Sequence, residues 1–156
     1  MGSKRERRYL KLNTDVMFSS KSDNWATPQS FFDELNKEFN FIIDVCADET
    51  NHKCEIYYNK VVDGLTKEWT NDAVWCNPPY GRAIGEWVKK AYEDQKKYSN
   101  VIVMLLPART DTKWFHNYIY GKAEIRFIKG RLKFGNSNTP APFPSMVVIY
   151  RNDDFS

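Results

Sequence analysis

Apolar side chains recur along this chain with two different periods, and together these periods predict helices that alternate with strands. Residues 28–39 and 84–97 place aromatic and aliphatic side chains on one helical face and charged side chains on the opposite face. Residues 41–45, 73–76 and 101–106 form short apolar runs that are typical of buried strands. The last of these runs is apolar on both faces, as expected of a central strand in a parallel sheet.

The remaining pattern is weaker and richer in strands. It predicts a strand at 55–58, a short helix at 112–120, and further strands at 125–128, 131–134 and 146–150. Alternation followed by a strand-rich end predicts an α/β fold, with a mostly parallel three-layer sheet and an antiparallel C-terminal edge.

Polar groups follow several of the predicted strands directly. Ligands of parallel sheets bind beyond the carboxyl ends of the strands. Asp44, Asn77 and Pro107 each lie at or just past the end of a predicted strand, so we expect them to gather on one rim. At the start of the first helix, Thr27 followed by Pro28 is typical of an N-cap and a first helical residue.

Length and composition indicate one globular domain. The chain has 156 residues, of which 42% are hydrophobic, and a net charge of +3. We expect residues 1–24 to form a basic N-terminal arm or flap, and residues 25–156 to form a single domain. Cations cluster in the first dozen residues, where they could touch phosphates or form a solvated tail. No signal peptide and no apolar run of spanning length is present, so we expect a cytoplasmic protein with no membrane contact.

The three cysteines are an odd number in strand-like surroundings, which favours reduced core thiols over a disulfide framework. Cys46, Cys54 and Cys76, with His52, could be a zinc set, but no pair has the C-x2-C spacing. We therefore predict no metal.

The tetrapeptide Asn77-Pro78-Pro79-Tyr80 is the strongest chemical signal in the chain. The Asn77 side chain offers a carbonyl acceptor, and Pro78 stiffens the turn and leaves its own carbonyl free to accept. Tyr80 adds a flat ring. Two fixed acceptors beside a stacking surface suit a planar base with an exocyclic amino group. The alternative is a Pro-Pro strand terminator with an incidental aromatic residue.

Methylation of the adenine amino group would need these groups. The N6 lone pair is delocalised into the ring, so both N6 hydrogens must be held by acceptors as the nitrogen pyramidalises toward a methyl donor. Asn77 Oδ1 and the Pro78 carbonyl could hold them, while Tyr80 stacks on the base. A paired base would have to flip out of the duplex to reach the rim.

Several blocks of the chain resemble the phage-type DNA N-6-adenine methyltransferase family. They are Trp-Ala-Thr-Pro at 25–28, Asp-Val-Cys-Ala at 44–47, Trp-Cys-Asn-Pro-Pro-Tyr at 75–80, Leu-Pro-Ala-Arg-Thr-Asp-Thr at 106–112, Gly-Arg-Leu at 130–132 and Ala-Pro-Phe-Pro-Ser at 141–145. The resemblance implies a Rossmann-like class I methyltransferase fold, S-adenosylmethionine as the cofactor, and methyl transfer to N6 of adenine in double-stranded DNA.

The resemblance also assigns roles to individual residues. It implies that the tetrapeptide is catalytic and that the cofactor is bound by Thr27, Pro28, Asp44, Cys46 and Ala47. An acidic residue for the cofactor ribose should follow the second strand, where Asp63 and Asn59 are the candidates. Asp44 could instead be an N-cap or a turn residue. The usual glycine-rich loop after the first strand is missing, since no glycine occurs there before Gly64.

Four further residues are candidates for binding the substrate: Arg109, Asp111, Arg131 and Phe143. Arg109 and Asp111 follow the central strand and could hold a phosphate or the base, or could pair with each other. Arg131 lies beside Lys133 on a predicted strand that faces solvent, where both could contact phosphates. Phe143 could cover the second face of a flipped base, or could anchor its own loop.

Two rival functions remain open at this stage. Asn-Pro-Pro-Tyr also serves enzymes that methylate adenine in RNA or the glutamine amide in proteins. The missing glycine loop suggests, alternatively, a nucleic-acid-binding module without catalysis. Either residues 1–24 and 109–143 recognise the DNA sequence, or specificity is loose, or a homodimer contributes.

Overall fold

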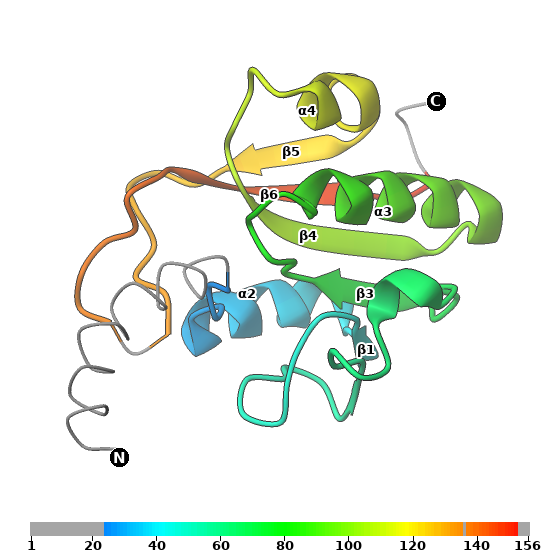
Figure 1. Ribbon diagram of the computed structural model, residues 1–156, viewed down its shortest axis with the longest axis horizontal. Helices are drawn as coiled ribbons and strands as arrows, with labels where there is room; N and C mark the ends of the chain where they lie inside the picture. Colours follow the sequence, from blue (N-terminus) through cyan, green and yellow to red (C-terminus); the bar gives the residue numbers. More distant parts are fainter. Residues whose placement is uncertain (1–23, 136, 153–156) are drawn as a thin grey trace, which may run out of the picture.

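A six-stranded sheet with the order β2-β1-β3-β4-β6-β5 forms the centre of the protein (Figure 1). The computed structural model describes residues 24–135 and 137–152. The strands are β1 (Ile43–Asp44), β2 (Ile56–Tyr57), β3 (Ala73–Cys76), β4 (Val101–Pro107), β5 (Glu124–Phe127) and β6 (Ser145–Tyr150). The first four are parallel, and β6 runs antiparallel to both of its neighbours. The predicted α/β sheet with an antiparallel C-terminal edge is confirmed.

Helices cover both faces of this sheet (Figure 1). They are α2 (Gln29–Phe39), α3 (Ile84–Tyr98) and α4 (Lys113–Tyr118), with a 3-10 helix, η1 (Gly64–Thr66). The Phe32 ring of α2 packs against Trp75 of β3 with ring centroids 5.3 Å apart. Because side chains alternate along a strand, the neighbours of Trp75 face α3 on the other side. Every residue of β3 and almost every residue of β4 is buried, as the apolar runs predicted.

Two local predictions are wrong. Thr27 does not cap α2, because Pro28 occupies the N-cap position and no side chain caps the helix. Residues 131–134 do not form a strand. Gly130 and Gly135 flank that segment with φ values of +81° and +62°, which turn the backbone away from an extended path. In place of a strand ladder, Ala141 N donates a backbone hydrogen bond to Leu132 O, at 2.8 Å.

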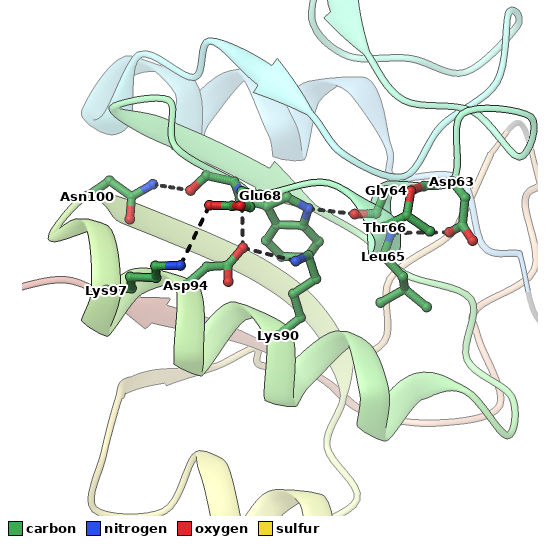
Figure 2. A network of polar contacts seen from close by, with 10 residues as sticks. Asp63, Gly64, Leu65, Thr66, Glu68, Lys90, Asp94, Lys97 and Asn100 are labelled. Atoms are coloured by element: carbon green, nitrogen blue, oxygen red, sulfur yellow. Dashed lines mark hydrogen bonds and ion pairs between the residues drawn. The ribbon is translucent and has the colours of Figure 1, made fainter.

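A polar network ties the segment between η1 and β3 to α3 (Figure 2). Asp94 Oδ2 accepts hydrogen bonds from the buried Trp69 N–H, at 2.9 Å, and from Lys90 Nζ, at 3.1 Å. Asn100 Nδ2 donates to Trp69 O, and Trp69 Nε1 donates to Gly64 O, at 2.9 Å each. Trp69 is thus fixed at both its backbone and its indole, and it holds η1 in place.

Within the described residues, no helix is both long and apolar enough to cross a membrane. The segment expected to form an arm, residues 1–24, lies outside the described residues except for its last residue.

Candidate active site at the carboxyl rim of the sheet

The parallel strands β1, β3 and β4 end at one edge of the sheet, which we call the rim. Asp44 ends β1, Asn77 directly follows β3, and Pro107 ends β4. The register places Asp44 beside Trp75 and Cys76 beside Met104, so the three strand ends are adjacent. The sequence prediction that these groups gather on one rim is confirmed.

Asn77 presents a buried acceptor at this rim. Its Nδ2 donates to the Trp25 carbonyl, at 2.5 Å, and to Thr27 Oγ1, at 2.9 Å. Its Oδ1 is buried and has no hydrogen-bond partner in the described part of the chain. No described residue donates a hydrogen bond to the Pro78 carbonyl either. A buried acceptor without a partner is costly, so the site is arranged for a ligand that donates hydrogen bonds.

Tyr80 is more deeply buried than a residue that stacks on a base is expected to be. Its side chain is 3% exposed, and its hydroxyl donates to Leu105 O at 3.0 Å. Burial raises the pKa of Tyr80 well above its usual value, so the phenol remains protonated and neutral. Pro79 precedes it and is half-buried. In this structure the Tyr80 ring is not open to a base.

Two rings pack on Tyr80 and a third ring packs on both of them, and these residues form an aromatic cluster of Trp25, Tyr80, Phe134 and Phe143. Phe143 and Phe134 meet Tyr80 edge to face, with centroids 5.6 and 6.2 Å away. Trp25 meets the same two rings at 5.1 and 5.5 Å. The Gly135 N–H donates to Ala26 O, at 2.8 Å, and ties the backbones of the two segments together. Phe143 therefore anchors its loop against the rim, which is one of the two roles expected for it.

Asp44 organises the turn after β1. It is 2% exposed, and its carboxylate accepts hydrogen bonds from Cys46 N, at 3.2 Å, and from Lys53 N, at 3.0 Å. Burial raises the pKa of Asp44 to about 6, although these backbone hydrogen bonds oppose the change. In the structure Asp44 thus acts as a turn residue, which is one of the roles expected for it.

The turn itself uses its own backbone donors. Cys46 N is bound by Asp44, and Ala47 N donates to Tyr58 O at 3.0 Å. Burial, with the nearby carboxylates of Asp44 and Asp63, raises the pKa of the Cys46 thiol to about 12, so this thiol stays protonated. Asp63 therefore lies near the turn. Its Oδ1 accepts from Leu65 N, at 3.1 Å, and its φ is +60°.

A glycine from another segment, Gly64 of η1, packs against the backbone just after β1. A Cβ atom on Gly64 would lie 2.2 Å from Val45 O and 3.3 Å from the Trp87 indole. Only a residue without a side chain fits here. Sequence reasoning noticed Gly64 only as the first glycine after the loop. Its close contact with Val45 is a tertiary contact, which the local sequence pattern does not predict.

The cationic candidates lie exposed around the rim. Arg109 Nη1 donates to Tyr80 O at 3.2 Å, and no ion pair joins it to Asp111 within the described residues. The expected alternative of an Arg109–Asp111 pair is therefore not realised, and Asp111 is exposed. Arg131 Nη1 donates to Ala141 O, also at 3.2 Å, and so braces the loop that carries Phe143.

The cysteines do not form a metal site in the structure. Cys46, Cys54 and Cys76 are free thiols. Among residues 24–135 and 137–152, no three side chains of histidine, cysteine, aspartate or glutamate lie close enough together to hold an ion.

The chain is similar in sequence to proteins of one family. The sequence profile of the DNA N-6-adenine-methyltransferase (Dam) family matches residues 15–152. A DNA N-6-adenine-methyltransferase of Escherichia phage T1 is 38% identical over 128 residues, which cover 81% of this chain and 52% of the T1 protein. One of Haemophilus phage HP1 is 33% identical over 139 residues, which cover 84% and 80%.

The chain thus spans about half the length of the T1 relative. Among solved structures, a proposed methyltransferase from Thermoplasma acidophilum aligns over 82% of this chain and 66% of its own, with 11% identity and a TM-score of 0.41. The family match begins at residue 15, inside the segment expected to be an arm. With most of its length matched by the family profile, the chain belongs to the DNA N-6-adenine-methyltransferase (Dam) family.

Proposed function

We propose that this chain transfers a methyl group from S-adenosylmethionine to N6 of an adenine flipped out of double-stranded DNA. One observation carries the proposal: the rim holds two unused acceptors, the buried Asn77 Oδ1 and the Pro78 carbonyl, on consecutive residues. An exocyclic amino group has two hydrogens, and it matches this pair.

The two acceptors would act most strongly as the reaction proceeds. When bound, the cofactor would supply an electrophilic methyl group on a sulfonium. As N6 takes up positive charge, its two N–H groups become better donors to Asn77 Oδ1 and the Pro78 carbonyl. Acceptors that are already in place gain more from the charged transition state than from the neutral base, which lowers the barrier. A proton-abstracting side chain is not needed for this step, because the N6 proton becomes acidic once the methyl group is attached.

The residues near the rim fit the cofactor. Helix α2 starts without a side-chain cap and has no acidic residue in its first turn, so its N-terminal N–H groups can hold the methionine carboxylate beside Thr27 and Pro28. Asp63 uses one carboxylate oxygen on Leu65 N, and the other is available for the ribose hydroxyls. Cys46 and Ala47 would contribute surface contact, because their N–H groups are already bonded.

A row of unpaired cations supports DNA as the substrate. Lys129, Arg131 and Lys133, which we call the cation row, are exposed, and no described carboxylate pairs with them. By contrast, Arg126 of β5 is held by Glu38 and Glu124, at 2.8 Å each. The loop that follows β5 lies on the rim side of the sheet, since β6 begins beside Pro107. Phosphates of a duplex above the rim would meet this row.

The aromatic cluster would receive the flipped base. Tyr80 and Phe143 would stack on its two faces, and Phe143 would turn aside from its present contact with Tyr80 to admit it. Arg109 and Asp111, which are exposed beside the cluster, would hold the flanking backbone and the base edge. A homodimer would add recognition surface, and light scattering with and without DNA would detect it.

The test is product analysis. Unmethylated duplex DNA, RNA and a glutamine-containing protein substrate are incubated with the protein and S-adenosylmethionine, and the products are analysed by mass spectrometry. We expect N6-methyladenine in the DNA alone, and its loss in Asn77→Ala by at least about 100-fold. Asn117→Ala, on the exposed face of α4, is the matched control and should be fully active. Methyl-glutamine or methylated RNA in place of methylated DNA would replace the proposed substrate. If no methylated product forms with any substrate, the alternative of a nucleic-acid-binding module without catalysis would stand instead.

A further inference from the structure

We infer that Thr27 is a positioning residue that fixes the orientation of the Asn77 amide. The inference rests on the proposed function and differs from the cofactor contact that the family resemblance implies for Thr27. Thr27 is 4% exposed, and its Oγ1 lies 2.9 Å from Asn77 Nδ2.

An asparagine amide has nearly the same shape in its two orientations, which differ by a half-turn. Only one orientation points Oδ1 toward a base amino group. The other points an NH2 group there, and two donors would then face each other. The site therefore needs something that distinguishes the oxygen of Asn77 from its nitrogen.

The Trp25 carbonyl and the Thr27 hydroxyl make this distinction. A carbonyl can only accept, so the side of Asn77 that faces Trp25 O must be the NH2 group. Thr27 Oγ1 accepts the second N–H. Both hydrogens of Asn77 Nδ2 are thus bonded, and Oδ1 is left as a buried acceptor without a partner in the described part of the chain. With Thr27 buried, no water can readily replace its hydroxyl.

These contacts link residues that are 50 and 52 positions apart in the sequence. The segment before α2 therefore contributes to catalysis through Asn77 rather than by touching the reacting atoms. Loss of the Thr27 hydroxyl would leave one Asn77 N–H unpaired and allow the amide to rotate, which reduces the fraction of molecules that are ready to react.

The test compares Thr27→Val, which keeps the shape and removes the hydroxyl, with Thr27→Ser, which keeps the hydroxyl. We expect kcat to fall by about 10- to 100-fold in Thr27→Val, because a misoriented group in a catalytic site costs that much. KM for DNA and calorimetric Kd for S-adenosylmethionine should change by less than about twofold, and Thr27→Ser should keep most of the activity. A Thr27→Val variant that weakens cofactor binding with kcat intact would show a cofactor contact and overturn the inference.

A second readout does not depend on activity. In 15N-labelled protein, the side-chain amide signals absent from Asn77→Ala identify Asn77. Thr27→Val should shift one of these two proton signals upfield and speed its exchange with solvent, whereas Thr27→Ser should not. Unchanged Asn77 signals in Thr27→Val would refute the hydrogen bond even if the protein methylates DNA. If the wild-type protein forms no N6-methyladenine, the proposed function fails, while the same signals still decide the role of Thr27.

Discussion

The backbone of Gly64 lies directly against the carbonyl of Val45, with room for a hydrogen but not for a methyl group. This contact sits at the end of β1, where many nucleotide-binding folds place glycines so that a ligand can approach. Here the close approach is made by the protein itself, and η1 fills the space beside the turn. Under the proposed function, the cofactor would lie across this surface rather than enter a glycine-rich loop.

Gly64→Ala should destabilise the protein by about 2–3 kcal/mol, since the new methyl group would meet a backbone oxygen and an indole that cannot both move away. Urea unfolding measures this change. Gly85→Ala is the control, because its Cβ would make only an ordinary contact, 3.5 Å from Trp114, on a helix. Stability there should be unchanged or slightly higher. Equal losses in both variants would mean that Gly64 is not at a close contact.

Asp94 should matter more than its sequence neighbour Glu93. Asp94→Ala leaves the buried Trp69 N–H without an acceptor, which should cost about 1–3 kcal/mol in the free energy of unfolding. Glu93 pairs with Lys89 at 3.9 Å, and more than half of each side chain is exposed, so Glu93→Ala should change stability by less than about 1 kcal/mol. Thermal unfolding of the two variants side by side tests the difference. It would be contradicted by a stable Asp94→Ala protein.

Asp44 should make stability depend on pH in the mildly acidic range. Its pKa in the folded protein is about 6, above an ordinary 3.8, because burial disfavours the carboxylate. Between these values the folded protein holds a proton that the unfolded chain has released. The contribution of Asp44 to stability is thus fully present below pH 3.8, declines as pH rises to about 6, and is then constant.

Asp44→Asn removes this titration and adds a loss that does not depend on pH, because Cys46 N and Lys53 N bind different carboxylate oxygens and an amide has only one oxygen. The stability of the wild type minus that of Asp44→Asn should therefore fall by up to about 3 kcal/mol between pH 4 and pH 7. Urea unfolding at several pH values gives this difference directly. A difference that stays flat would show that Asp44 titrates normally.

The cation row should determine how DNA affinity responds to salt. Each phosphate contact adds about 0.9 to the slope of log affinity against log salt concentration, so alanine at Lys129, Arg131 and Lys133 should reduce the slope by nearly 3. Fluorescence anisotropy with a labelled duplex measures it. Alanine at Lys37, Lys89 and Lys97, which are ion-paired elsewhere on the surface, makes the same change in net charge and should leave the slope nearly unaltered.

Periodicity predicted those parts of the fold that depend on burial along a single element. The runs at 73–76 and 101–106 became buried strands because their side chains cannot face water on either side. Residues 131–134 alternate in a similar way, with Leu132 and Phe134 packed against the core and the cations exposed, but they pair with no strand of the described sheet. An alternation of apolar and polar side chains indicates which side chains are buried. Strand pairing also requires a partner strand, which the local sequence does not specify.

The candidate site likewise combines residues that the local sequence predicts with contacts that only the tertiary structure shows. Asn77 and Pro78 could be identified from the chemistry of four consecutive residues. The bond from Asn77 to Thr27 could not, because it joins segments brought together only by the packing of α2 against the sheet. The place of Thr27 before Pro28 predicts a helix cap, whereas its hydroxyl accepts a hydrogen bond from Asn77 at the rim.

Trp25 makes two kinds of contact: its ring packs in the aromatic cluster, and its carbonyl accepts a hydrogen bond from the Asn77 amide. Partial unfolding of the loop around Phe143 would therefore free the segment at Trp25 and, with it, the Asn77 amide, while the buried strands remain folded. Heat should abolish the proposed methyl transfer at a temperature below that at which the sheet unfolds. Assays of activity and of global unfolding would then report two distinct midpoints for one small domain.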